Sequence, residues 1–204
     1  MSDKFLNRVY QQATPEETQA LYDAWAASYD AEIAENGYAT PGRVAEALYR
    51  HLPEPDAPIL DFGCGTGLSG LALKLAGFAV IDGMDPSPEM LDGARRKGVY
   101  RDLTVIDVNA SAPVPQNIYN AITAIGVIGT GAAPAGTAHI LMKALPPGGL
   151  LGLSLNDHAL SDPQYEGALN QWLDCGAARL LFKEHGPHLP GMNLNCNVYI
   201  IEKA

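Results

Sequence analysis

Residues 59–67 read Ile-Leu-Asp-Phe-Gly-Cys-Gly-Thr-Gly, and this stretch decides the fold. Its apolar beginning is typical of a buried strand, and an apolar run over 68–76 predicts a helix directly after it. Gly63, Gly65 and Gly67 permit positive φ and let backbone N–H groups approach a ligand at the start of that helix. The stretch therefore predicts a strand, a glycine-rich turn and a helix, as in ligand-binding α/β folds.

The same alternation of strand, loop and helix continues along the chain. Further strands are expected at 78–84, 103–106, 118–128 and 150–155, and helices after Ser87-Pro88, near 134–145 and after Asp162-Pro163. The last two strands, near 178–183 and 194–202, have no helix between them, so they should pair antiparallel at one edge. The predicted fold class is α/β, a Rossmann-like doubly wound sheet that is mostly parallel with an antiparallel edge strand.

The N-terminal part is predicted to form a helical cover. Thr14-Pro15-Glu16-Glu17 has the form of a capping box with proline at the first helical position. The helix that it opens carries Leu21, Trp25 and Tyr29 at a four-residue spacing, which places them on one face. A second helix is expected after Pro41.

Length and composition predict one globular domain. The chain has 204 residues, of which 47% are hydrophobic and 18% charged, and three prolines between 52 and 58 separate a helical cover (1–52) from a Rossmann-like core (58–204). The sequence shows no bilayer-spanning apolar run and no signal core, and its three cysteines are widely spaced without a CxxC pair. We therefore expect a cytoplasmic protein without a membrane partner, a disulfide framework or a metal site.

The charge balance weighs against nucleic acid as a partner. The formal net charge is −10, from 23 acidic and 13 basic side chains. Binding through phosphates needs a basic face. The densest basic run, Arg95-Arg96-Lys97, is interpreted as the solvated face of a helix.

Three acids fall at the expected carboxyl ends of consecutive strands, which is the ligand edge of an open α/β sheet. They are Asp61, Asp85 and Asp107. Asp85, about twenty residues after the glycine turn, is placed to accept hydrogen bonds from both ribose hydroxyls of an adenosine cofactor. Asp107 is placed to meet the adenine amino group.

Two cofactors fit this pattern. Residues 65–70 match the dinucleotide motif G-x-G-x-x-G, with Asp85 at the distance expected for NAD. Asp61 at the mouth of the turn would repel a pyrophosphate and attract a cofactor that carries a sulfonium and an ammonium. The Tyr199-x-x-x-Lys203 match to a hydride-transfer motif lies in a predicted strand and is interpreted as chance. A glycine turn without any ligand is the third possibility.

The sequence resembles the class I S-adenosylmethionine-dependent methyltransferases over nearly its whole length. The resemblance is carried by 59–67, by the Gly-Met-Asp-Pro-Ser-Pro-Glu-Met-Leu run at 83–91, by 106–108 and by Leu-Pro-Pro-Gly-Gly at 145–149. The N-terminal run 22–30 and the Gly-Val-Tyr-Arg run at 98–101 are most similar to the methyltransferase-like group related to the Williams–Beuren region protein. In this family the N-terminal helix folds over the cofactor.

The resemblance implies S-adenosyl-L-methionine as cofactor and a role for individual residues. Asp61, Gly63 and Gly65 would line its methionine part, Asp85 would bind the ribose, and Met90 would pack near the adenine. Ile125 would approach the end that bears the methyl group. The cofactor-binding residues implied are Trp25, Tyr29, Asp61, Gly63, Cys64, Gly65, Asp85, Pro86, Met90, Asp107, Val108 and Ile125.

The methyl acceptor is expected to be a small molecule. Residues 125–130 contain neither an Asn-Pro-Pro-Tyr or Asp-Pro-Pro-Tyr motif for a flipped adenine nor a Pro-Cys for cytosine. A general base is needed only if the attacking atom carries a proton. His158, with Asp157, is the first candidate for that base, and His185 and His188, in a predicted loop before the last strand, come second. The alternatives are an NAD(P)-binding oxidoreductase and a protein that binds S-adenosylmethionine without catalysis.

Overall fold

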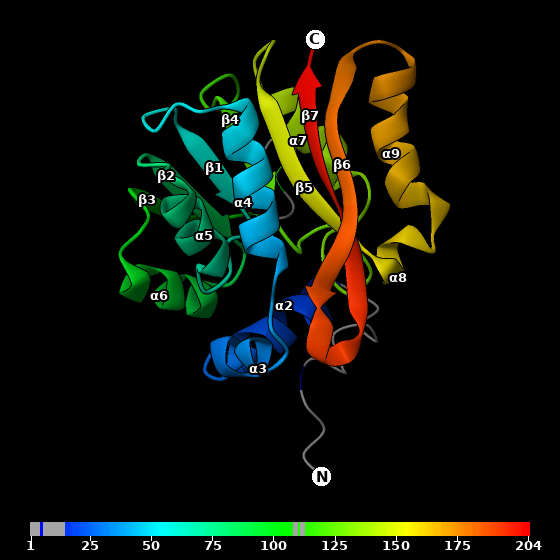
Figure 1. Cartoon of the computed structure of the whole chain (residues 1–204). Coiled ribbons are helices and arrows are strands. Elements are labelled where there is room, and N and C mark those ends of the chain that lie inside the picture. Colours follow the sequence, from blue (N-terminus) through cyan, green and yellow to red (C-terminus); the bar gives the residue numbers. More distant parts are fainter. Residues whose placement is uncertain (1–4, 6–14, 108–109, 111–112) are drawn as a thin grey trace.

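The computed structural model describes residue 5, residues 15–107, residue 110 and residues 113–204 (Figure 1). Thr14 of the predicted capping box and Val108, a predicted cofactor contact, lie outside the described residues. Within the described part of the chain, no helix combines the length and the apolar character needed to cross a membrane.

In the part of the chain that the structure describes, seven strands form one sheet in the order β3-β2-β1-β4-β5-β7-β6 (Figure 1). Strands β1 to β5 pair in parallel, whereas β7 runs antiparallel to both β5 and β6. This arrangement confirms the predicted α/β class with its antiparallel edge. The strands are β1 (Ile59–Phe62), β2 (Ile81–Asp85), β3 (Asp102–Val105), β4 (Ala121–Ala124), β5 (Leu150–Asn156), β6 (Ala178–Leu189) and β7 (Leu194–Lys203).

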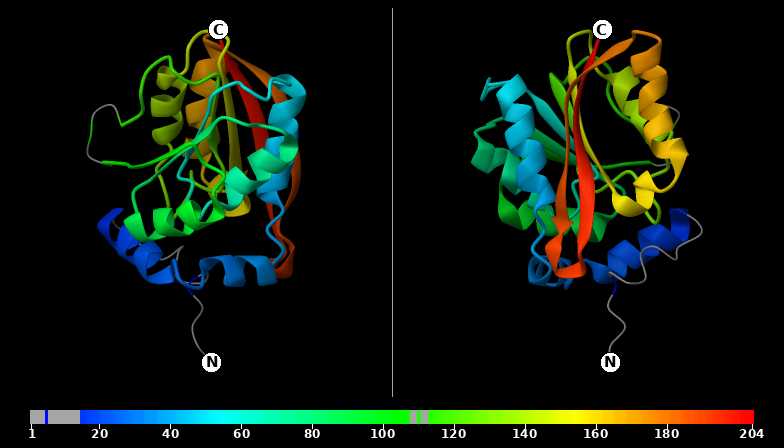
Figure 2. Two further views of the ribbon diagram at one scale, coloured as in Figure 1. Left: turned by 90° about the vertical axis from the view of Figure 1, so that its left-hand side faces the viewer. Right: turned by 45° about the vertical axis from the view of Figure 1, so that its right-hand side comes forward.

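Helices pack on both faces of the sheet (Figure 2). Ile59 of β1 packs with residues of α4 and α5, while its neighbour Leu60 packs in a second cluster with residues of α7 and α9. This alternation follows from the two-residue period of a strand. The helices are α2 (Pro15–Trp25), α3 (Tyr29–Glu35), α4 (Thr40–His51), α5 (Leu68–Ala76), α6 (Pro88–Lys97), α7 (Thr137–Ala144), α8 (Asp157–Leu160) and α9 (Pro163–Asp174), with a 3-10 turn, η2 (Pro190–Met192).

Two helices that begin with a capping residue and a proline start where the sequence predicted them. Ser87 caps α6 by accepting a hydrogen bond from the Met90 N–H at 3.1 Å, and Asp162 caps α9 in the same way through Gln164 at 3.0 Å. In both helices a proline follows the cap, where its missing N–H costs nothing. The predicted bounds of α5 match the structure.

Three predicted segments were wrong in detail. The N-terminal helix is interrupted, because α2 ends at Trp25 and α3 begins at Tyr29 after the N-cap residue Ser28. The strand predicted over 118–128 is confined to β4, since Ile118 is 54% exposed and Gly126 has a φ of +70°. His185 and His188 lie in the long strand β6 rather than in a loop.

The helices α2 and α3 lie across the carboxyl end of the parallel strands, at the bottom of Figure 1. The tip of the β6–β7 hairpin comes down to the same end and meets them. Its Gly191 N–H donates to the Asn36 carbonyl at 3.0 Å, and the Ala39 N–H donates to the His188 carbonyl at 3.0 Å. The edge that carries the predicted site is therefore enclosed by segments from both ends of the chain.

Candidate functional site

The glycine turn after β1 is fastened to the end of β2. The N–H groups of Gly63 and Cys64 both donate to the Met84 carbonyl, at 2.7 and 3.0 Å. Gly63 has a φ of +70°, and a Cβ there would lie 2.5 Å from the Val127 side chain, so no other residue fits without strain. Gly65 also has a positive φ, +52°, but a Cβ there would meet open space. The turn thus leaves room for a ligand at Gly65.

Asp61 lies inside the fold beneath this turn. Its side chain is fully buried and accepts three hydroxyl hydrogen bonds, from Ser69 at 2.5 Å, Tyr100 at 2.7 Å and Thr123 at 3.0 Å. Burial raises the pKa of this carboxyl, and the three hydrogen bonds oppose that shift. The buried carboxylate therefore links β1 to α5, to β4 and to the segment before β3 through these hydrogen bonds.

Asp85, at the end of β2, lies against the turn from the other side. It accepts hydrogen bonds from the Gly65 N–H at 2.8 Å and the Ser87 N–H at 2.9 Å. Burial raises its pKa to about 6, and the nearby carboxylates of Asp61 and Asp23 act in the same direction. Buried negative charge therefore gathers at the turn, which suits a cationic ligand and disfavours a pyrophosphate.

The other predicted cofactor residues differ in how deeply they are buried. Met90 is buried on α6, and Ile125 is buried directly after β4. Cys64 is buried in the turn, and burial raises the pKa of its thiol. Asp107 is exposed just beyond β3, while Pro86 accepts a hydrogen bond from Gln19 of α2 at 3.0 Å.

A polar cluster joins the cover to the glycine turn. Asp30 of α3 accepts hydrogen bonds from the Thr66 hydroxyl and from the Lys97 ammonium, both at 2.5 Å. Lys97 also donates to the Thr66 carbonyl at 2.7 Å. The break between α2 and α3 lets Asp30 reach this position, which the predicted continuous helix does not provide.

A small cavity lies between the cover and the carboxyl ends of β4 and β5. It holds about 50 Å³, enough for a few water molecules. Trp25, one of its lining residues, is 1% exposed, and its indole N–H has no hydrogen-bond partner among the described residues. The cavity is lined by Tyr22, Trp25, Tyr29, Ile33, Tyr38, Gly126, Ile128, Gly129, Thr130, Ala132, Ser154, Asn156, His188 and Leu189.

Only some of the predicted candidate bases line this cavity. His188 lines it, whereas Asp157 and His158 are not among the lining residues. Asp157 accepts a hydrogen bond from the Asn195 N–H at 3.0 Å, and His158 is exposed on α8. His185 is exposed on β6 and pairs with the Asn197 side chain at 3.0 Å. The role predicted for Asp157 and His158 stays a prediction.

Sequence reasoning did not single out the residues that complete the site from elsewhere in the chain. Tyr100 and Thr123 support Asp61, and Thr40 contacts the His188 ring, although each is distant in sequence from its partner. The Ser154 hydroxyl oxygen accepts a hydrogen bond from the Gly126 N–H, in the loop after β4, at 2.9 Å. Such residues have no local motif, because only the folded chain brings them to the site.

The strand order, the glycine turn with open space at Gly65 and the acid at Asp85 define a class I S-adenosylmethionine-dependent methyltransferase. When bound, that cofactor supplies an activated methyl group. The chain belongs to the methyltransferase domain family, whose model matches residues 36–195.

Known proteins agree with this assignment. The chain is 34% identical to human methyltransferase-like protein 27 over 76% of this chain and 63% of that protein. It is 36% identical to the 18S rRNA (guanine(1575)-N(7))-methyltransferase of Saccharomyces cerevisiae over 37% of this chain and 27% of that protein. The chain thus spans less than two thirds of the length of these curated relatives.

A solved structure shares the fold. It is the 1,6-didemethyltoxoflavin-N1-methyltransferase of Burkholderia thailandensis, with 1,6-didemethyltoxoflavin and S-adenosylhomocysteine bound. The TM-score is 0.62 at 20% identity, covering 95% of this chain and 92% of that chain. The closer resemblance to the Williams–Beuren group stays a prediction.

Proposed function

We propose that the protein transfers the methyl group of S-adenosylmethionine to an uncharged small molecule held in the cavity beneath α2 and α3. The observation that carries this proposal is the position and lining of the cavity. It lies beside the ends of β4 and β5, and its described lining residues include no Lys, Arg, Asp or Glu. A site without a cation offers nothing to the phosphates of a nucleic acid.

In this proposal the cofactor lies along the glycine turn. Asp85 holds the ribose hydroxyls with the lone pairs that its two backbone hydrogen bonds leave unused. The negative charge of Asp61, Asp85 and Asp23 attracts the cofactor's positive groups, and Met90 packs near the adenine. Trp25 and Tyr29 close over it from the cover, so that residues 1–52 and 58–204 work as one unit.

The chain's contribution to the reaction is mainly positional. Holding acceptor and methyl group together in a cavity that excludes water lowers the barrier to an in-line displacement. The aromatic rings of the cover form the wall that excludes water. Tyr22 and Trp25 are stacked at 5.8 Å, and Trp25 and Tyr29 meet edge to face at 4.7 Å.

The class of acceptor is tested with S-adenosylmethionine labelled in its methyl group. The protein is incubated with the small-molecule filtrate, the purified RNA and the protein fraction of one cell extract. We expect label in the filtrate and none above background in RNA. Label in RNA would overturn the proposed acceptor class while leaving the cofactor assignment intact. Asp85→Asn serves as the control, and at a low concentration of S-adenosylmethionine it should reduce labelling in every fraction.

A further inference from the structure

His188 is a buried histidine in the wall of the proposed acceptor cavity. It is 6% exposed, lies near the tip of the β6–β7 hairpin, and meets the Tyr38 ring edge to face at 5.3 Å. The hairpin brings it to the carboxyl ends of the parallel strands, although it is more than sixty residues from β4 in sequence. An imidazole in such a wall is placed to contact the acceptor directly.

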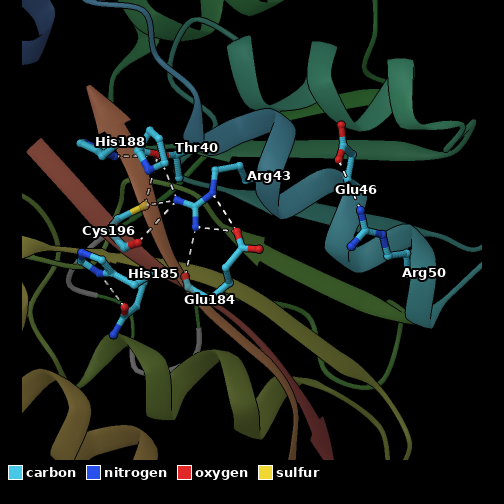
Figure 3. A network of polar contacts seen from close by, with 10 residues as sticks. Thr40, Arg43, Glu46, Arg50, Glu184, His185, His188 and Cys196 are labelled. Carbon is cyan, nitrogen blue, oxygen red and sulfur yellow. Dashed lines mark hydrogen bonds and ion pairs between the residues drawn. The ribbon is translucent and has the colours of Figure 1, made fainter. Parts of the chain in front are cut away.

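One ring nitrogen of His188 is held by a polar network that joins the hairpin to α4. Nδ1 lies 2.8 Å from the Thr40 hydroxyl, which in turn lies 3.3 Å from the Cys196 sulfur (Figure 3). Arg43 donates to the same sulfur at 3.2 Å and to the Pro187 carbonyl at 3.0 Å. These contacts fix the orientation of the ring. A hydrogen bond at one ring nitrogen of a histidine also influences which form the other nitrogen takes.

The structure records no hydrogen bond from the described residues to the other nitrogen, Nε2. With Nδ1 protonated toward Thr40, Nε2 presents a lone pair. Burial, the largest influence, lowers the pKa of His188 to about 4, Asp157 opposes this shift, and Arg43 and His158 add to it. The ring is therefore neutral near pH 7, which is the form that accepts a proton.

The rest of the lining indicates what the acceptor looks like. Four aromatic side chains, Tyr22, Trp25, Tyr29 and Tyr38, face a cavity whose described wall holds no ionised side chain at neutral pH. Aromatic walls favour flat, uncharged ligands. A neutral imidazole in that wall is useful when the attacking atom carries a proton that must leave.

From this arrangement, and resting on the proposed function, we infer that His188 is the catalytic base and that the acceptor is a flat, uncharged molecule with a hydroxyl or ring N–H. In the step, the acceptor's oxygen or nitrogen bonds to the methyl carbon as the carbon–sulfur bond breaks. The electron pair of that bond goes to sulfur, and the acceptor's proton goes to Nε2. Thr40 is a positioning residue that fixes the ring.

The inference is tested with a matched pair of probes, 4-nitrophenol and 4-nitroanisole, which differ by the hydrogen that Nε2 would accept. Binding to the protein saturated with S-adenosylhomocysteine is followed by the fluorescence of Trp25. Trp172→Phe removes the other tryptophan, which lies on α9 and pairs with His139. The measurements are made well below neutral pH but above the pKa of His188, so that most of the phenol is uncharged and the ring stays neutral.

We expect the protein to prefer the phenol about tenfold, the effect of one hydrogen bond. His188→Phe keeps a ring in the wall and should remove this preference, whereas His51→Gln, an exposed histidine on α4, should keep it. A wall that served only for packing would lose affinity for both probes equally. His188→Gln retains a hydrogen-bond acceptor, so it should keep probe binding if His188→Phe misfolds.

The tautomer provides a readout that needs no probe. Nitrogen-15 shifts of the histidine ring should show the proton of His188 on Nδ1, and a proton on Nε2 would overturn the inference. Loss of the preference in His158→Phe, with His188→Phe unchanged, would assign the base to α8 instead. If S-adenosylhomocysteine binds but neither probe alters Trp25 fluorescence, the cavity is not the acceptor site, and the proposed function fails together with this inference.

Discussion

Asp85 carries a buried negative charge, and within the described part of the chain no Lys or Arg forms an ion pair with it. We predict that Asp85→Asn weakens S-adenosylmethionine binding roughly ten- to a hundredfold, because a charged hydrogen-bonding partner contributes about 1.5–3 kcal/mol. Calorimetric titration measures this. Asp82→Asn is the matched control on the same strand. It disrupts the contacts with Arg101 and Tyr119 and should lower stability without changing the cofactor's dissociation constant.

The same residue gives cofactor binding a pH dependence. Burial raises the pKa of Asp85 to about 6, so the carboxylate becomes protonated as pH falls through that value. The cofactor's positive charge favours the ionised form, so its affinity should decrease as the pH is lowered from about 7.5 to about 5. The titrations are repeated across this range. A wild-type profile as flat as that of Asp85→Asn would contradict the prediction.

Asp61 makes a different contribution, because its hydrogen bonds connect β1 to three other parts of the fold. We predict that Tyr100→Phe lowers the free energy of unfolding by about 1–3 kcal/mol, since a buried carboxylate loses one of three hydroxyl donors. The same hydroxyl accepts the Gly70 N–H at 3.0 Å, which would also lose its partner. Urea denaturation measures the loss. Tyr49→Phe, whose ring packs on Phe78, should change stability much less.

At the scale of elements, Asp30 is a polar contact between α3 and the glycine turn. Its side chain is 46% exposed, so the ion pair with Lys97 contributes at most about 1 kcal/mol to global stability. We predict that Asp30→Ala leaves the urea midpoint nearly unchanged but releases bound S-adenosylmethionine several-fold faster, because the cover opens more readily. Stopped-flow displacement measures the rate. Asp92→Ala removes an exposed pair with Arg95 on α6 and should have no such effect.

The elements show which parts of the fold the sequence could predict. Ser87-Pro88 and Asp162-Pro163 begin helices through bonds to residues two or three positions away, so the local pattern was sufficient. The break at 26–28 has no glycine or proline, and it places Asp30 on Thr66, a contact that only the folded chain reveals. Strand β6 includes Gly186 and Pro187, which are typical of loops, yet it pairs with β7 along its length.

The candidate site, too, has a part that the sequence could predict and a part that it could not. The glycine turn and Asp85 lie about twenty residues apart on one βαβ unit, so their spacing indicated an adenosine cofactor. The cavity could not be predicted, because its walls come from α2, α3, two loops and a hairpin that are far apart in sequence. His188 was ranked below His158 for this reason, since nothing local shows that β6 returns to the ligand edge.

At the scale of the whole molecule, the cavity and the cover together imply a cycle of opening and closing. The free volume of about 50 Å³ is smaller than the proposed flat aromatic acceptor requires, so the proposed function implies that α2 and α3 move when the acceptor enters. We predict that amides in α2 and α3 exchange with deuterium much faster than those of β1 and β4, because β1 and β4 are fully buried and paired on both sides within the sheet, whereas α2 and α3 lie at its edge. Adding S-adenosylmethionine should slow exchange in both helices, since in the proposed binding mode the cofactor contacts the sheet edge and the cover together, while α9, on the flank, keeps its rate. Mass spectrometry of peptic fragments resolves these segments.

Equal exchange in the cover and in β1 would mean that the cover does not open separately, and the acceptor would have to enter by another route.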